Sequence, residues 1–154
     1  MIEPTPVSTI AHLIQLAIAP VFLLAGIGAI LNVLANRLAR IVDRVRSLEA
    51  GFLDYDEDER QRVRKELWRL GKRMRLVNAS ITTCTASALF VCLVVALLFV
   101  ADLAEVRFGT PVALLFIVAM AFLIVALVLF LLEIQLAAKS LRIRQELLEL
   151  PPDD

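Results

Sequence analysis

Three long apolar segments dominate the chain, and charged or turn-forming residues separate them. The segments run from about Ile10 to Ala35, from about Ala79 to Ala101 and from Pro111 to Leu132. Each is close to the roughly 20 residues that an α-helix needs to cross the hydrocarbon core of a bilayer. Because a helix satisfies its own backbone hydrogen bonds in lipid, the pattern predicts an all-α, polytopic membrane protein with three transmembrane helices.

The two connections between these segments differ in length and chemistry. Asp102–Thr110 is a tight loop, so the second and third spans are expected to form an antiparallel hairpin. Within it, Gly109, Thr110 and Pro111 predict a turn, an N-cap and a proline at the first helical position. Arg37–Val77 is instead long and highly charged.

Apolar residues inside the long connection recur at alternating steps of three and four, as in helices that pack along a seam. Gly51 predicts the end of one helix, and Asp54 or Asp56 predicts the start of the next. We therefore expect a cytoplasmic antiparallel helical hairpin that is continuous with transmembrane helices one and two. The two seams are Leu31, Leu34, Leu38, Ile41, Val45, Leu48 and Phe52, and Val63, Leu67, Leu70, Met74, Val77 and Ile81.

The positive charges predict the orientation of the chain. Of the 16 Lys and Arg residues, 12 lie in Arg37–Val77 and three, Lys139, Arg142 and Arg144, follow the third span. The positive-inside rule assigns both regions to the cytoplasm. The expected division is an extracytoplasmic N-terminus (1–9), helix one (10–36), the cytoplasmic hairpin (37–77), helix two (78–101), an extracytoplasmic loop (102–110), helix three (111–137) and a cytoplasmic tail (138–154).

Composition agrees with a membrane protein and argues against catalysis. Hydrophobic residues make up 60% of the chain and the mean hydropathy is +0.81, whereas a soluble domain has about 45–50% apolar residues. Cys84 and Cys92 would lie about 12 Å apart along one helix, too far for a disulfide. With one histidine and no nucleophile–base arrangement, the sequence predicts no enzyme, no cofactor and no metal site.

A polar stripe follows one face of the first predicted helix. Asn32, Asn36, Ala39, Asp43 and Arg46 recur at steps of four and three. One interpretation is that the Asn side chains hydrogen-bond across helices and fix their register. The alternative is that the stripe lines a wet path or faces a second subunit.

Small and hydroxyl-bearing residues mark the second span, and a single acid marks the third. Thr83 and Ser87 lie on a small-residue face that suits close helix packing or, alternatively, lines a conduit. Glu133 lies near the inner end of the third span. It is expected to pair with an arginine, or to bind a proton or cation. Its candidate partners are Arg37, Arg73 and Arg75.

Basic residues form a collar at the predicted cytoplasmic boundary. Contact with anionic lipid headgroups is the plainer interpretation, and selection of anions at the mouth of a ring is the alternative. At the outer end lie the polar residues His12 and Gln15, and His12 is expected either to be simply hydrated or to act as a pH sensor. Nucleic acid is not an expected partner, because acids are interspersed with the bases and stacking aromatics are sparse. The collar consists of Arg37, Arg40, Arg44, Arg69, Lys72, Arg73 and Arg75.

A resemblance to a known family lies in Ile10–Ala29 (IAHLIQLAIAPVFLLAGIGA) and Asn32–Arg44 (NVLANRLARIVDR). These segments resemble a bacterial family of small membrane proteins known only as a domain of unknown function. The resemblance extends over most of the chain and implies a bacterial inner-membrane protein without assigning an activity. In topology alone, the chain is also similar to proton-channel subunits of the TolQ, ExbB and MotA type, which assemble as rings.

Two hypotheses about function follow from these patterns. The first is a homo-oligomeric, channel-like protein that conducts ions through a central pore, because one copy has too few spans to enclose a wide path. The second is a membrane-anchored scaffold whose coiled-coil hairpin binds a cytoplasmic protein. The residues expected to line the pore or the subunit interface are Asn32, Asn36, Arg40, Thr83, Ser87 and Glu133.

Overall fold

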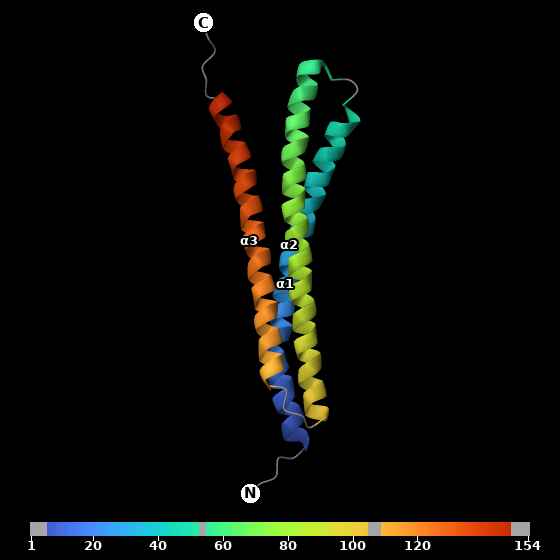
Figure 1. Cartoon of the computed structure of the whole chain (residues 1–154), viewed down its shortest axis with the longest axis vertical. Coiled ribbons are helices and arrows are strands. Elements are labelled where there is room, and N and C mark those ends of the chain that lie inside the picture. The colour runs from blue at the N-terminus through green and yellow to red at the C-terminus, as the bar shows by residue number, and fades with distance from the viewer. Residues whose placement is uncertain (1–5, 53–54, 105–108, 149–154) are drawn as a thin grey trace. The chain divides into compact units, whose positions relative to one another are not determined.

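In the residues that the computed structural model describes, the chain forms three long helices (Figure 1). Helix α1 spans Pro6–Ala50, α2 spans Glu57–Leu103 and α3 spans Gly109–Leu148. The structure describes residues 6–52, 55–104 and 109–148, and their side chains within 14–52, 55–104 and 109–138. There are no strands in these residues, so the all-α expectation is confirmed.

The turn between α1 and α2 follows the local signals in the sequence. Helix α1 ends at Ala50, and the Phe52 N–H donates to the Glu49 carbonyl at 3.2 Å. Asp56 is the N-cap of α2, because its carbonyl accepts the first helical hydrogen bond, from the Arg60 N–H, at 2.9 Å. The other candidate cap, Asp54, lies outside the described residues.

Gly51 leaves room for a neighbouring side chain at this turn. A Cβ atom at this position would lie 2.7 Å from the Tyr55 hydroxyl oxygen. The Tyr55 ring thus lies close to the helix end expected at Gly51. A side chain at position 51 would have to displace that ring.

Both ends of α3 differ from the expected bounds. The helix begins at Gly109, so Thr110 and Pro111 lie within its first turn, a shift of the size common at helix ends. At the other end, the helix continues to Leu148. The segment expected to be a tail is therefore helical from Lys139 to Leu148, because no proline or glycine interrupts it before Pro151.

The chain divides into two compact units that each contain parts of all three helices. The first unit comprises Met1–Val33 and Thr82–Val125, and the second comprises Leu34–Ile81 and Ala126–Asp154. Pro20 lies inside α1 in the first unit without ending the helix.

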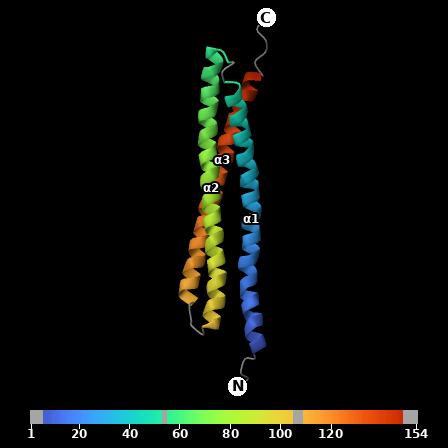
Figure 2. The ribbon, with the colours of Figure 1, turned by 90° about the vertical axis from the view of Figure 1, so that its right-hand side faces the viewer.

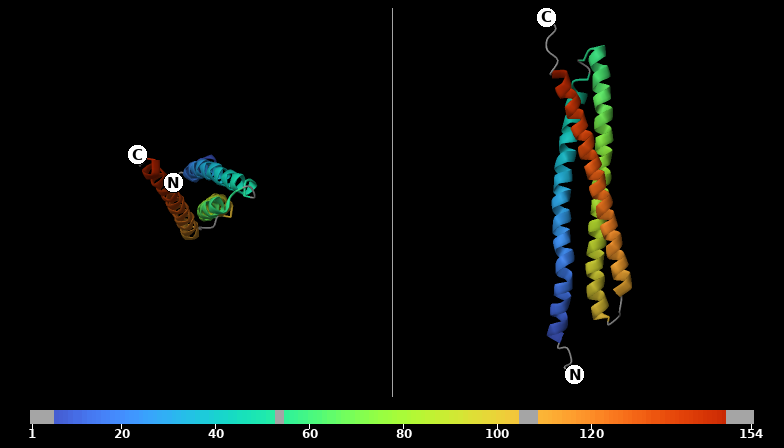
Figure 3. Two further views of the ribbon diagram at one scale, coloured as in Figure 1. Left: turned by 90° about the horizontal axis from the view of Figure 1, so that it is seen from above. Right: turned by 90° about the vertical axis from the view of Figure 1, so that its left-hand side faces the viewer.

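The first unit is apolar both inside and outside. The rings of Phe90 on α2 and Phe122 on α3 stack with centroids 5.3 Å apart, and these parts of the two helices lie side by side (Figure 3). Large apolar side chains also cover the outer surface, among them Phe22, which is 75% exposed. Such exposure is expected where lipid rather than water surrounds the helices. The buried core consists of Ala17, Ile27, Cys84, Val91, Val94, Ala119 and Leu123.

In the second unit, α1 and α2 form an antiparallel helical hairpin (Figure 2). Its core repeats every seven residues along each helix, as the predicted seams require. The other seam positions, such as Leu38 and Leu67, are half-buried. An ion pair between Arg44 and Glu66 at 2.9 Å lies beside the core. The buried apolar residues of this hairpin core are Leu34, Ile41 and Leu48 on α1 and Val63, Leu70 and Val77 on α2.

The hairpin core gives a test of this packing. Replacing Ile41, which is 4% exposed, with Ala is expected to lower the free energy of unfolding by about 2–4 kcal/mol. The matched change Leu38→Ala, at a half-buried seam position, should lose no more than about half as much, because less apolar area leaves water there. Thermal unfolding in detergent, followed by helical circular dichroism, measures both. Equal losses would contradict the assigned register.

Candidate functional site

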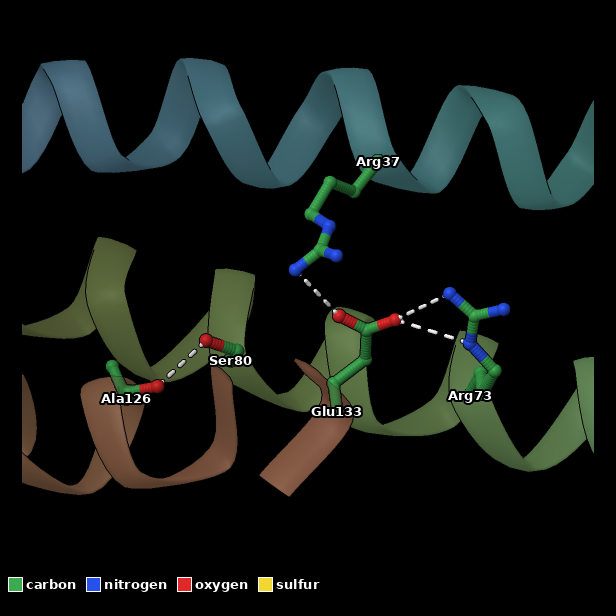
Figure 4. Close-up of polar contacts among 5 residues, drawn as sticks. All are labelled: Arg37, Arg73, Ser80, Ala126 and Glu133. Carbon is green, nitrogen blue, oxygen red and sulfur yellow. Dashed lines mark hydrogen bonds and ion pairs between the residues drawn. The ribbon is translucent and has the colours of Figure 1, made fainter. Parts of the chain in front are cut away.

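A buried carboxylate lies between two arginines in the second unit. Glu133 on α3 has a fully buried side chain, with Arg37 of α1 on one side and Arg73 of α2 on the other (Figure 4). The three side chains, called here the arginine clamp, bring together one residue from each helix. This confirms that Glu133 pairs with Arg37 and Arg73.

The two arginines bind the carboxylate in different ways. Arg73 donates two hydrogen bonds to Oε1, from Nε at 3.1 Å and from Nη2 at 2.8 Å. Arg37 Nη1 lies 3.0 Å from Oε2, yet this oxygen accepts no well-directed hydrogen bond from the described residues. The Arg37 guanidinium also lies 5.4 Å from the centroid of the Phe130 ring. Arg37 therefore acts on the carboxylate through charge, whereas Arg73 holds it by directional bonds.

A repeated register between α2 and α3 places Glu133 at this position. In the second unit, the Ser80 hydroxyl donates to the Ala126 carbonyl at 2.8 Å. Arg73 precedes Ser80 by seven residues and Glu133 follows Ala126 by seven, so the antiparallel register that joins Ser80 to Ala126 also joins Arg73 to Glu133.

The same register holds in the first unit. There the Ser87 hydroxyl donates to the Ala119 carbonyl at 2.7 Å, and both residues are buried. Ser80 and Ser87 thus pack inside the chain, which supports the packing interpretation of the small-residue face.

The clamp carries unequal charge. Two guanidinium groups lie against one carboxylate, and no other Asp or Glu among the described residues forms an ion pair with either arginine. Burial of an ion is costly unless opposite charge and hydrogen bonds compensate it. Glu133 is compensated twice, while the two arginines together retain one excess positive charge.

The remaining site residues predicted from the sequence lie elsewhere. Arg75 and Arg40 are exposed and are not part of the clamp, and Arg44 pairs with Glu66. Thr83 is half-buried on α2. Asn32 and Asn36 are exposed on α1, as are the other members of the polar stripe, Ala39, Asp43 and Arg46.

At the other end of α1, Gln15 is exposed. His12 is helical, but its side chain lies outside the described residues. Within the part of the chain that is described, no group of three or more His, Cys, Asp or Glu residues could hold a metal ion.

The role of Trp68 was not predicted from the sequence, although its neighbours Arg69 and Lys72 were assigned to the basic collar. Trp68 on α2 is 67% exposed, and a shallow pocket beside it is lined by Arg64, Lys65 and Arg69. The Lys72 ammonium lies 5.9 Å from the centroid of the Trp68 ring. We call these five residues the Trp68 patch. The helical spacing Arg64–Trp68–Lys72 was the available signal, since residues four apart share a helix face.

The fold defines the general class of the protein. All three helices include stretches long and apolar enough to cross a membrane, within Ile14–Ala50, Glu57–Leu103 and Gly109–Ala138. Their outward apolar side chains and the polar clamp inside are the features of a multi-pass membrane protein.

Comparison with known families identifies the family of the chain. Residues 17–143 match the DUF2721 family, which is described as a protein of unknown function, and the chain belongs to this family. No curated protein and no solved structure matches the chain. The resemblance noted in the sequence is thus confirmed, and the function must be inferred from the chain's own residues.

The clamp makes a quantitative prediction about stability. Glu133→Gln leaves two guanidinium charges facing each other without a carboxylate, and is expected to cost about 3–5 kcal/mol. Glu66→Gln is the matched control, because the same change there breaks an ion pair whose side chains are 53% and 43% exposed. It should cost at most about 1 kcal/mol. Thermal unfolding of both variants in detergent measures the difference, and similar losses would show that the clamp is not a stabilising element.

Proposed function

We propose that this protein is a membrane-anchored scaffold whose helical hairpin binds an acidic segment of a cytoplasmic protein. In this proposal, residues 10–36, 78–101 and 111–137 span the bacterial inner membrane. The N-terminus lies outside, and the hairpin of residues 37–77 and the C-terminus lie in the cytoplasm. The segregation of Lys and Arg residues to the hairpin and the C-terminal region supports this orientation.

The observation that carries the proposal is the exposure of Trp68. It is the only tryptophan of the chain, and 67% of it is exposed, although most of the large apolar side chains of the hairpin are buried or half-buried. Tryptophan and arginine are the residues most enriched at the energetic centres of protein interfaces. An aromatic surface surrounded by four basic side chains complements an acidic segment that carries an apolar residue.

The position of Trp68 along α2 favours a protein over the lipid surface. Trp68 precedes Asn78, the first residue of the proposed span, by ten residues, which corresponds to about 15 Å of helix. The headgroup layer on each side of the hydrocarbon core is only about 5–8 Å thick. The ring therefore lies beyond the headgroups in a helix that crosses the membrane steeply.

Trp68 provides the readout for a direct test. A photo-crosslinker at Arg64 identifies the partner in cells, and the purified partner is then titrated onto the reconstituted protein. Since Trp68 is the only tryptophan, burial of its ring should shift the fluorescence to shorter wavelength when the partner lacks tryptophan. Trp68→Ala and Arg69→Glu are each expected to weaken binding by about thirtyfold or more, as for a residue at an interface centre.

The control is Arg46→Glu, an equal charge reversal at an exposed position on α1. It should leave affinity within about twofold, because Arg46 lies on the other helix of the hairpin and is not part of the Trp68 patch. If Arg46→Glu and Arg69→Glu weakened binding equally, the partner would be bound only by nonspecific attraction between charges. Quenching of Trp68 by brominated lipid in nanodiscs would show that the patch contacts the membrane, and would overturn the protein-docking proposal.

A second candidate function, a homo-oligomeric channel, is favoured by the exposed amides on α1. Asn32 and Asn36 lie on the surface of the chain within the proposed first span. Polar side chains in a span usually face other helices or water rather than lipid. A second copy or a water-filled axis beside α1 would provide such surroundings. Ser87 and Glu133, by contrast, are buried within the chain.

This second candidate makes its own prediction. If α1 lines a pore, native mass spectrometry should detect a closed oligomer of four or more chains. Asn36→Leu should then lower ion flux into liposomes about tenfold or more by removing a polar lining group. Val33→Leu adds bulk at a neighbouring exposed apolar position and should leave flux unchanged. A monomer or dimer, or flux that is insensitive to Asn36→Leu, would exclude this path.

A further inference from the structure

The arginine clamp has the properties of a site for an anion. Glu133 neutralises one of its two arginines, and the described residues supply no second carboxylate. The excess cation is held at a constrained position, because Arg37 is attracted by Glu133 and its guanidinium lies over the Phe130 ring. A fixed, uncompensated cation that is partly removed from water favours binding of a counter-ion.

The hydrogen-bonding capacity of Arg37 agrees with this. A guanidinium carries five N–H donors, yet that of Arg37 makes no well-directed hydrogen bond to the described residues. The side chains of Arg37 and Arg73 are 31% and 25% exposed, so a ligand can reach both. Arg73 already uses Nε and Nη2 to bind the carboxylate. The available donors therefore belong chiefly to Arg37.

The chemistry of these donors selects the ligand class. A planar guanidinium fork matches two oxygens of a phosphate group and can bind it through parallel hydrogen bonds. Arg37 directly follows the first proposed span and Glu133 lies near the inner end of the third. In a membrane this is the level of the lipid phosphates, and basic pockets between helices on the cytoplasmic side bind anionic headgroups.

We propose that the arginine clamp binds the phosphate group of an anionic phospholipid headgroup, with Arg37 as its main ligand and Glu133 as the residue that positions both arginines. This inference rests on the membrane insertion proposed above and is independent of docking at the Trp68 patch. It also distinguishes Arg37 from the rest of the basic collar. Exposed Arg40 lies one turn further along α1, and within the described part of the chain no carboxylate or aromatic ring holds its side chain.

The test measures bound lipid on the intact protein. Purified protein in a neutral detergent is titrated with phosphatidylglycerol, phosphatidylcholine or inorganic phosphate and examined by native mass spectrometry. The wild-type chain is expected to retain one phosphatidylglycerol at about tenfold lower concentration than phosphatidylcholine, since a charge-assisted contact contributes about a tenfold change in affinity. Equal retention of the two lipids by the wild-type chain would overturn the proposal without any variant.

Arg37→Gln tests the proposed main ligand. The remaining Arg73–Glu133 pair is neutral and keeps both of its hydrogen bonds, so the fold should survive. Retention of phosphatidylglycerol should fall about tenfold, because the excess charge and the available donors are lost. Arg40→Gln is the matched control, with the same change of charge on the same helix, and should retain the lipid within about twofold.

The outcomes separate the possible explanations. Equal losses in Arg37→Gln and Arg40→Gln would show diffuse attraction to the collar and would overturn the site. If millimolar inorganic phosphate displaces the lipid from the wild-type chain, and Arg37→Gln alone abolishes this effect, the phosphate site is established. Its ligand would then be a soluble ion rather than a headgroup. Arg64→Glu should leave lipid retention unchanged, so failure of the docking proposal does not imply failure of the lipid-binding proposal.

Membrane insertion is tested separately. Release of the wild-type protein from membranes by alkaline carbonate would reject membrane insertion itself.

Discussion

The carboxylate of Glu133 is the constraint on which the second unit depends. Its side chain is fully buried, so an ionised group there requires opposite charge within contact distance. Arg37 from α1 and Arg73 from α2 supply it, and the carboxylate thereby joins three helices at one level. Apolar packing alone tolerates several alignments of long helices, whereas a buried ionic group tolerates few.

The alternative alignments show how this constraint works. If α3 moved by one heptad relative to α2, Ala126 would take the place of Glu133 opposite Arg73, and the carboxylate would lie among residues that do not neutralise it. The hydroxyl contact of Ser80 with the Ala126 carbonyl would also break. Alanine at positions 119 and 126 permits the close approach that these hydroxyl–carbonyl bonds require. Small residues thus bring the helices together, and the ionic group selects the register.

Much of this arrangement could be predicted from the sequence. The three apolar segments, Gly51 at the turn and Asp56 at the start of α2 are local signals with direct physical causes, namely lipid thickness, steric access and backbone capping. Glu133 could be paired with arginines because few acids lie near the end of a span. The helical seams could also be predicted, since apolar residues at steps of three and four in a charged segment lie on one face of a helix and indicate packing along that face.

The remaining details depend on which way each helix face points, and periodicity does not contain this information. Ser87, Thr83 and Asn36 all lie on regular polar faces, but Ser87 is buried, Thr83 is half-buried and Asn36 is exposed. Likewise, Arg73 and Arg75 are both basic residues on the same turn of α2, and only Arg73 faces α3. Two residues along a helix turn the side chain by about 200°. The basic collar, which was defined from the sequence alone, therefore includes both arginines that bind the Glu133 carboxylate and arginines that lie on the surface.

The division between inner and outer polar residues narrows the search for function. Ser80, Ser87 and Glu133 have partners within the chain, so these groups hold the helices together. Partners outside the chain can reach only what remains exposed, which includes the Trp68 patch and the polar stripe of α1. Arg37 belongs to both classes, because it attracts a buried carboxylate while part of its guanidinium-bearing side chain stays accessible. A ligand that binds Arg37 would therefore act on the same contact that aligns the helices, so occupancy of the site and stability of the helix bundle should be thermodynamically linked.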